Sequence, residues 1–425
     1  MNGVHDAERL KELQALPLSR KIQITQTRII EWYQHYEGNV CVSFSGGKDS
    51  TVLMHIARQI YPDIPAVFSN TGLEYPEIQR FVRAFDNVDI VTPAMRFDEV
   101  ISTYGYPLIG KEVAEAIHYA RKLSSQSVQV ERESTAAHRP YGATNRKREE
   151  LLGNRPSGNG WKWGGNGQPH QDGVSEKQTD DPSREMGRNR GSRRTGVVTK
   201  CQFNKDKWLP LVYTPIPISH YCCFKMKKSP MKKYQHEHGY YPILATLAEE
   251  SRIRKQGWIR HGCNAFESAN PISQPMSFWT EQDVLAYIVK YGVEIASVYG
   301  DIVTTDKSGI DYPPIDLCGN IQPNLRCTGC QRTGCIFCAF GFHLEKGETR
   351  FQRIARTHPR QYEYSIEGGQ WADNPHYDPA APKMDGEWEN WNPKKIWIPS
   401  KKGLGLGKVF DMVNEIYGKD FYRYK

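Results

Sequence analysis

Two kinds of segment are absent from this sequence of 425 residues. It has no run of about 18 apolar residues, so we expect no membrane-spanning helix. Residues 1–8 contain no apolar signal region, so we expect a cytoplasmic protein. Apolar residues are also scarce, at 38% of the chain with a mean hydropathy of −0.65. This scarcity predicts that part of the chain lies outside any compact core.

Cysteine and positive charge are, in contrast, well represented. The chain contains 10 cysteines and has a formal net charge of +8. In a reducing compartment these thiols favour metal ligation over disulfides. The charge is consistent with binding of nucleotides or nucleic acids, and the length with roughly two or three domains.

The stretch Ser45-Gly-Gly-Lys-Asp-Ser50 separates a predicted strand, residues 39–44, from a predicted helix, residues 51–58. A strand that enters a helix through two glycines presents backbone N–H groups at the positive end of the helix, where they can hold phosphate. Lys48 adds a cation, and the hydroxyls of Ser45 and Ser50 add donors. The spacing differs from that of the Walker A loop. The alternative is a plain turn between a strand and a helix.

Strands and helices alternate around this loop. We expect a helix over residues 19–37, strands over 64–70 and 88–91, and a helix over 97–104. The pattern predicts an α/β fold, with a parallel sheet and helices on both faces. Ligands of such sheets bind at the carboxyl ends of the strands. The loop and residues 71–77 both follow strands, so we expect them to face one ligand.

Residues 123–205 form a predicted basic insertion, rich in Gly, Arg and Asn and poor in aliphatic residues. We expect it to be disordered or to become ordered on a partner. Its basic residues and Trp161 and Trp163 favour binding of DNA or RNA by charge and stacking. The alternative is a solvated linker. Beyond it, we expect a strand over residues 241–246 and a helix over 277–288 that is capped by Thr280.

Six of the cysteines lie in two groups. Cys222 and Cys223 are adjacent, and Cys327, Cys330, Cys335 and Cys338 form two C-x-x-C pairs. Zinc ribbons separate such pairs by about 15–20 residues, whereas here only four residues intervene. Thiolate-only sites also suit iron–sulfur clusters. Both zinc and a cluster therefore remain alternatives.

Three motifs stand in an order that resembles the phosphoadenosine phosphosulfate reductase family of the adenine-nucleotide α-hydrolase superfamily. They are Ser45–Ser50, Thr71-Gly72 with Tyr75-Pro76-Glu77, and Glu250-Ser251 with Arg254. The resemblance implies catalytic roles for Lys48, Asp49 and Arg254. It also implies nucleotide contacts from Ser43, Ser45, Gly46, Gly47, Lys48, Asp49, Ser50, Thr71, Gly72, Tyr75, Glu77, Glu250, Ser251 and Arg254.

The string from Cys222 to Met231 further resembles the adenylyl-sulfate reductase branch of that family. In that branch a Cys-Cys pair and a later C-x-x-C hold a [4Fe–4S] cluster. The resemblance thus implies that Cys222, Cys223, Cys335 and Cys338 are the ligands, with Cys327 and Cys330 as alternates.

The sequence departs from the family at two points. Leu247 stands where the family has an arginine, and no cysteine follows Cys338 to match the C-terminal nucleophile of the reductases. We therefore expect ATP-dependent sulfur transfer by activation of the α-phosphate, with Mg2+ between the phosphates, a sulfur-donor protein, and a nucleic acid as a candidate acceptor. The alternatives are reduction of adenylyl sulfate or its 3′-phosphorylated form by an external thiol, and a nucleotide-gated nucleic-acid-binding protein.

These interpretations divide the chain into five parts. We expect an N-terminal tail over residues 1–20 and a nucleotide-binding domain formed by 21–122 and 206–320. The insertion spans 123–205, a Cys-rich segment 321–345, and a C-terminal extension 346–425.

Overall fold

The computed structural model describes residues 5–121, 205–380, 383–384, 387–388 and 391–425. Nearly all of the predicted basic insertion, including its two tryptophans, therefore lies outside the described residues. In the part of the chain that the structure describes, no helix is both long and apolar enough to cross a membrane.

A six-stranded sheet in the order β3-β2-β1-β5-β7-β6 organises the nucleotide-binding half. Neighbouring strands run parallel except β6 and β7. In the central strand, Val42 pairs with Ala66 on one side and Ile243 on the other. The strands are β1 (Val40–Ser43), β2 (Ala66–Ser69), β3 (Val88–Val91), β5 (Tyr241–Ile243), β6 (Asn264–Ala265) and β7 (Ile272–Ser273).

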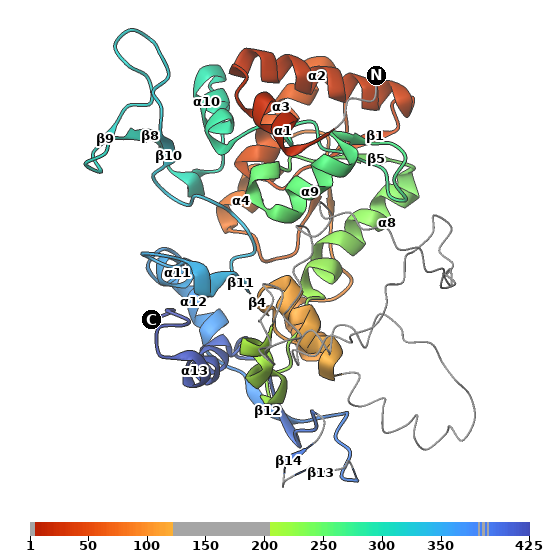
Figure 1. The fold of residues 1–425 in the computed structure, drawn as a ribbon, viewed down its shortest axis with the longest axis vertical. Coiled ribbons are helices and arrows are strands. Elements are labelled where there is room, and N and C mark those ends of the chain that lie inside the picture. Colours follow the sequence, from red (N-terminus) through yellow and green to blue (C-terminus); the bar gives the residue numbers. More distant parts are fainter. Residues whose placement is uncertain (1–4, 122–204, 381–382, 385–386, 389–390) are drawn as a thin grey trace, which may run out of the picture.

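Helices cover both faces of this sheet, which confirms the predicted fold class (Figure 1). Helices α2, α3 and α10 contact one another on one face, and α8 contacts β2 and β3 on the other. Helix α2 buries Ile22, Ile29 and Trp32, which recur at helical spacing, and this spacing explains which face of α2 packs against the core. The helices of this half are α1 (Ala7–Gln14), α2 (Leu18–His35), α3 (Lys48–Ile60), α4 (Pro76–Arg83), α5 (Phe97–Tyr104), α8 (Ser229–His238), α9 (Arg252–His261) and α10 (Glu281–Tyr291).

The C-terminal half is built around buried aromatic rings. Phe342, Phe351, Phe410 and Tyr422 contact one another, and they belong to the same hydrophobic cluster as the core beneath the sheet. Its elements are η6 (Phe342–Leu344), α11 (Arg350–Thr357), α12 (Pro359–Ile366), β12 (Gln370–Asp373), β13 (Lys383–Met384), β14 (Glu387–Trp388), β15 (Lys395–Ile398) and α13 (Leu406–Tyr417).

A short extended segment joins the two halves. Strand β4 (Leu108–Ile109) pairs in parallel with β11 (Ala339–Phe340), and Tyr106 forms a bridge with Ile218. In Figure 1, β4 and β11 lie between the sheet and the C-terminal helices α11–α13. The hydroxyl of Tyr422 also accepts a hydrogen bond from the Ile109 backbone N–H, at 3.0 Å. This segment therefore brings three distant parts of the chain together.

The described residues that flank the insertion are held close to each other. A helix over residues 111–121 ends at Arg121, whose buried guanidinium donates to the carbonyls of Leu211, Val212, Thr214 and Ile216. Those carbonyls belong to the 3-10 helix η2 (Asp206–Tyr213) and the residues just after it. These contacts hold together the two described segments on either side of the insertion.

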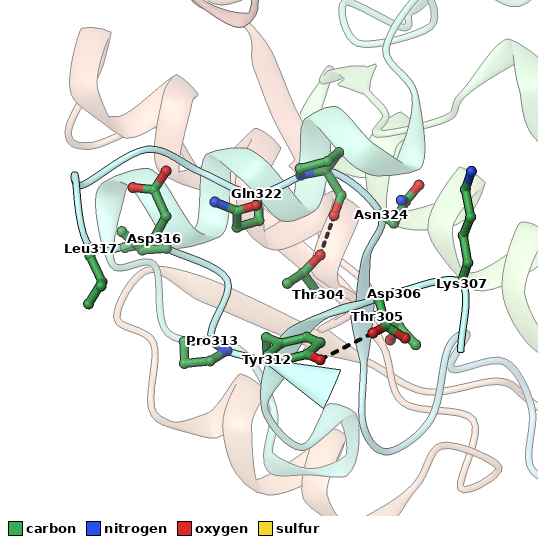
Figure 2. A pocket seen from close by; sticks show the side chains of 12 residues that line it. Thr304, Thr305, Asp306, Lys307, Tyr312, Pro313, Asp316, Leu317, Gln322 and Asn324 are labelled. Atoms are coloured by element: carbon green, nitrogen blue, oxygen red, sulfur yellow. Dashed lines mark hydrogen bonds between the residues drawn. The ribbon is translucent and has the colours of Figure 1, made fainter. Parts of the chain in front are cut away.

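A small sheet stands out from the body of the molecule (Figure 1). It consists of β8 (Ile302–Thr305), β9 (Asp311–Tyr312) and β10 (Leu325–Cys327). A cavity of about 540 Å³ lies in this arm. Figure 2 shows side chains that line it, among them Thr304, Tyr312, Leu317 and Gln322. None of the predicted site residues lines it, so the functional site is sought elsewhere.

Candidate functional site

The three predicted motifs meet at the carboxyl edge of the sheet. Residues 45–50 follow β1, residues 71–77 follow β2, and residues 250–254 run from the end of the 3-10 helix η4 (Ala248–Glu250), which follows β5, into the first turn of α9. The sheet order places β2 on one side of β1 and β5 on the other, so the strand order reverses at β1. Ligands of open α/β sheets bind at such a switch point. The parallel sheet that was predicted from sequence therefore places the motifs as expected.

The loop keeps its shape through glycine and hydroxyl contacts. Gly46 has a φ of +68°, and a Cβ there would lie 2.7 Å from Val82 and 2.8 Å from Ile78. Only glycine therefore fits against α4 without displacing it. The hydroxyl of Ser50 lies 2.9 Å from that of Ser45 and accepts from the Ser45 backbone N–H. Helix α3 begins at Lys48, within this stretch, so the positive end of a helix lies at Ser45, Gly46 and Gly47.

Lys48 is buried, with 3% of its surface exposed. A lysine in a loop is usually solvated, so nothing in the sequence indicated this burial. Its Nζ lies 3.1 Å from Glu281 Oε1 and donates to the Gln331 carbonyl at 3.0 Å. Burial lowers the pKa of Lys48, but Asp49 and Glu281 together outweigh burial and leave that pKa raised. The lysine is therefore charged, and it is held by the Cys-rich segment.

Two arginines and two carboxylates surround the opening of α3. Arg254 and Arg332 both pair with Glu250, and both act electrostatically on Asp49. Burial raises the pKa of Asp49, while Lys48 opposes the rise. Asp49 Oδ1 has no hydrogen-bond partner among the described residues. The nearest cation is Lys48 Nζ, which lies 4.0 Å from this oxygen and leaves its hydrogen-bonding capacity unused.

The remaining predicted nucleotide contacts lie nearby but are engaged within their own elements. Ser251 caps α9 by accepting from the Arg254 backbone N–H. The Thr71 hydroxyl donates to Glu74, and the Gly72 N–H donates to Asn70. Three predicted contacts remain. Ser43 is the last residue of β1, and Tyr75 directly precedes α4. The Glu77 carboxylate lies 3.2 Å from His358 Nε2.

Four of the six grouped cysteines lie in one electrostatic neighbourhood. Cys222 is influenced by Cys223, Cys335 and Cys338. The joining segment explains this arrangement, because Ile218, just before Cys222, bridges to Tyr106, while β11, just after Cys338, pairs with β4. The two halves of the set therefore come from opposite sides of residues 106–109.

Two lysines, Lys111 and Lys227, lie near these four thiols and favour their negatively charged forms. A hydrogen bond from Cys222 lowers the pKa of Cys223, with Lys111 and Lys227 acting in the same direction against burial. Burial raises the pKa of Cys335 to about 12, and Lys227 opposes it. The Nζ of Lys227 also lies 3.6 Å from Oε1 of Glu74, and Glu74 belongs to the loop that follows β2. Lys227 therefore links these four cysteines to the second predicted motif, residues 71–77.

The other pair, Cys327 and Cys330, lies elsewhere. Burial raises the pKa of Cys327 to about 11, against the effect of Lys48. Cys330 interacts with Tyr75 and Arg353. The six cysteines therefore fall into two electrostatic neighbourhoods, and the choice of metal ligands among them stays a prediction. Within the described residues, no three His, Cys, Asp or Glu side chains form a group that could hold a single metal ion.

Several polar residues of the site were not predicted from sequence. The Tyr299 hydroxyl accepts from the Lys48 backbone N–H at 3.1 Å and lies 2.6 Å from the Thr333 hydroxyl. Glu281, Arg332 and Arg353 are also new. Glu281 resembles an ordinary acidic residue in the first turn of a helix, so it gave no signal. Arg332 and Thr333 stand between the two C-x-x-C pairs, and that position was the one available indication.

Together, this fold and site define an α/β protein in which a glycine-rich loop at the start of a helix is contacted by a cysteine-rich segment. Residues 39–124 match the family model described as the phosphoadenosine phosphosulfate reductase domain. This part of the chain is a member of that domain family, which confirms the resemblance inferred from the three motifs.

Several curated relatives are similar to this chain over short stretches. A phosphoadenosine 5′-phosphosulfate reductase of Serratia proteamaculans is 31% identical over 85 residues, covering 17% of this chain and 35% of the relative. An adenosine 5′-phosphosulfate reductase of Bacillus cereus is 29% identical over 87 residues, covering 19% and 37%. An uncharacterized protein of Methanocaldococcus jannaschii is 33% identical over 69 residues, covering 15% and 17%. The matches thus span little more than a third of these relatives at most.

Proposed function

We propose that the protein is an enzyme of the sulfonucleotide reductase type, which binds an adenylyl sulfate at residues 45–50. One observation carries the proposal. The Cys-rich segment rests directly on the phosphate loop, through the 3.0 Å contact between Lys48 Nζ and the Gln331 carbonyl. Thiol chemistry and phosphate binding therefore share one site. The names of the matched relatives support the same substrate class.

In this proposal the loop holds the phosphate of the nucleotide. Backbone N–H groups of Gly46 and Gly47 and the Lys48 ammonium stabilise the negative charge that develops on it. Arg254, with Arg332 beside it, adds positive charge on the other side of Asp49. The predicted contacts of Ser43, Thr71, Gly72, Tyr75, Glu77, Glu250 and Ser251 would surround the rest of the nucleotide.

Cys222, Cys223, Cys335 and Cys338 are the proposed ligands of a [4Fe–4S] cluster. Their shared neighbourhood fits this group, because each thiolate of a cluster binds its own iron and the four sulfurs need not meet at one point. A zinc ion would require them to converge tetrahedrally, and the described residues contain no such convergence. When bound, the cluster supplies a redox-active iron–sulfur group.

A second candidate is ATP-dependent sulfur transfer with activation of the α-phosphate, in which a sulfur-donor protein supplies the sulfur. The observation that favours it is the buried Asp49 Oδ1, which has no hydrogen-bond partner in the described part of the chain. A carboxylate oxygen in this position suits Mg2+ held between phosphates. DNA or RNA bound by the insertion would then be the acceptor, and this part of the proposal rests on sequence alone.

Product analysis separates the two candidates. Anaerobically purified protein is incubated with adenylyl sulfate, its 3′-phosphorylated form or ATP, with an external dithiol and with or without nucleic acid. Sulfite released from a sulfonucleotide supports the reductase. Pyrophosphate and AMP released from ATP support sulfur transfer instead. If no nucleotide is converted, both candidates are wrong.

A further inference from the structure

The cation of the loop at residues 45–50 is engaged by residues from outside the family match at 39–124. Lys48 Nζ donates to the Gln331 carbonyl at 3.0 Å and lies 3.1 Å from Glu281 Oε1. Both partners present a negatively polarised or charged oxygen to the ammonium, as a phosphate does. The positive charge that the loop would offer to a nucleotide is therefore already used within the chain.

A backbone donor of the same loop is engaged in a similar way. The Lys48 N–H, at the first residue of α3, donates to the Tyr299 hydroxyl at 3.1 Å. That hydroxyl lies 2.6 Å from the Thr333 hydroxyl. A Cβ on Gly47 would lie 3.3 Å from the Tyr299 hydroxyl and 3.5 Å from the Thr333 hydroxyl. The two hydroxyls thus lie at the N-terminus of the helix, where anions bind.

Two of these contacts come from a short strap, residues 331–334, between two fixed ends. Cys330 and Ile336 are buried, and their N–H groups donate to backbone carbonyls at 2.9 Å and 2.7 Å. Within the strap three of the four residues are exposed, and Thr333 is half-buried. A segment with few buried contacts opens locally at low cost, while its buried ends stay in place.

The contacts that hold the strap on the loop are weak. One is an ion pair between Arg332 and Glu250, at 3.3 Å, in which 60% of the Arg332 side chain is exposed. Such an exposed pair contributes little to stability. The Gln331 carbonyl is neutral, so a charged phosphate oxygen forms the stronger hydrogen bond with the Lys48 ammonium. The strap therefore suits an occupant that a phosphate can displace.

We propose that residues 331–334 form an autoinhibitory strap, which takes the place of a phosphate on the loop and is displaced when a nucleotide binds there. The proposal rests on the proposed function, because that function places the phosphate of the nucleotide at residues 45–50. Binding then includes the cost of opening. The measured association constant is the intrinsic one multiplied by the fraction of molecules in which the strap is open.

Titration of strap variants tests the proposal. Thr333→Val preserves the shape of the side chain and removes the hydroxyl that contacts Tyr299. We expect adenylyl sulfate to bind about 2–10-fold more tightly, because the closed strap loses one hydrogen bond. Tyr299→Phe should also tighten binding. The double variant should gain less than the product of the two single gains, because both changes remove the same contact. Calorimetry on the full-length protein without thiol measures these affinities.

Adenosine and Thr27→Val are the controls. Adenosine has no phosphate to replace the strap, so its affinity should be the same in the variants and in the unmodified protein. Thr27 is exposed on α2, and its hydroxyl donates to the Gln23 carbonyl of the same helix. Thr27→Val makes the same chemical change as Thr333→Val and should leave the affinity for adenylyl sulfate unchanged. An equal gain for adenosine would mean that the variants loosen the whole site, which overturns the strap.

Unchanged or weaker binding of adenylyl sulfate in Thr333→Val, with clear binding to the unmodified protein, would overturn the strap and leave the proposed function standing. If Tyr299→Phe does not fold, Thr333→Val decides the question alone. If neither the unmodified protein nor Thr333→Val binds adenylyl sulfate, the assignment of the loop to a nucleotide phosphate fails, and the proposed function and the strap fail with it.

Discussion

The two C-x-x-C pairs of one short segment have the same spacing but different surroundings. Cys327 and Cys330 are tied by their backbone to residues 298–301 and lie beside Lys48 and Arg353. Cys335 and Cys338 lie where the segment has turned away, towards Cys222 and Cys223. The Ile336 N–H donates to the Leu73 carbonyl at 2.7 Å, and β11 pairs with β4.

This difference teaches that cysteine spacing alone does not define a metal site. Four cysteines in C-x-x-C-x4-C-x-x-C order look like one local set, yet the backbone contacts on either side of Gly334 send the pairs in different directions. Each pair meets its own cation, which is Lys227 for Cys335 and Arg353 for Cys330. The two pairs therefore have different surroundings although their spacing is the same.

The largest effect that we predict separates the pairs by iron content. Anaerobically purified protein should be brown and contain about four irons per chain. Cys223→Ser should lose most of this iron, because it removes a proposed ligand, whereas Cys327→Ser should keep it. Iron analysis and visible absorption check this. If Cys223→Ser keeps its iron and Cys327→Ser loses it, the local four-cysteine site is correct. A colourless protein with stoichiometric zinc would reject both cluster models.

The next prediction concerns Lys48, whose charge acts both on the loop at residues 45–50 and on Cys327. Lys48→Ala should weaken binding of adenylyl sulfate and ATP by roughly 1–3 kcal/mol, the cost of a charged hydrogen bond. Since Lys48 is buried against Glu281, the free energy of unfolding should also fall, by about 1 kcal/mol because Glu281 is partly exposed. Calorimetric titration and urea denaturation measure these changes, with Lys48→Met as the volume-matched control. Unchanged affinity for both nucleotides would contradict the loop assignment.

A smaller effect of opposite sign is expected at Glu281. Its carboxylate lies 3.1 Å from Lys48 Nζ, where it competes with a phosphate. Glu281→Gln should therefore tighten nucleotide binding by about 0.5–1 kcal/mol, the range of a partly exposed ion pair. Titration of this variant beside Glu249→Gln, which changes a neighbouring carboxylate, measures the difference. Weaker binding in Glu281→Gln alone would mean that Glu281 holds Lys48 in its productive position.

The smallest effect is expected when the predicted insertion is replaced, although this removes the most residues. Replacing residues 124–200 by a short glycine–serine linker should leave the melting temperature and nucleotide affinity nearly unchanged, because Arg121 already holds the flanking elements together. Calorimetry checks this, and aggregation of the variant would place the insertion in the core. If the insertion binds nucleic acid, the full chain should bind it with a steep salt dependence and the deletion variant should not bind it.

The sequence predicted what local physics determines. Helix α5 has the expected bounds, α4 begins at Pro76, and Thr280 and Asp283 form a capping box at the start of α10. The phosphate loop was recognised because its glycines and charges are contiguous. The match over residues 39–124 confirms the family of this part, whereas the domain boundaries and the roles of the site residues stay predictions.

What the sequence left unseen depends on contacts between distant residues. The burial of Lys48 requires Gln331, which lies 283 positions later. The gathering of the four proposed ligands requires β4, a strand of two residues whose signal is too short to read. The residues that interact with Cys330 are Tyr75, just before α4, and Arg353, in α11, and nothing in the spacing of the cysteines connects them. Such arrangements arise from packing of the whole chain rather than from any local pattern.

The separation of the four proposed cluster ligands from Cys327 and Cys330 is tested most directly by alkylation after iron removal. Protein is treated anaerobically with a chelator or left untreated, labelled with iodoacetamide, and analysed by peptide mass spectrometry. Iron removal should increase labelling of Cys222, Cys223, Cys335 and Cys338 and leave that of Cys327 and Cys330 unchanged. An increase at Cys327 and Cys330, with none at Cys222 and Cys223, would contradict the division.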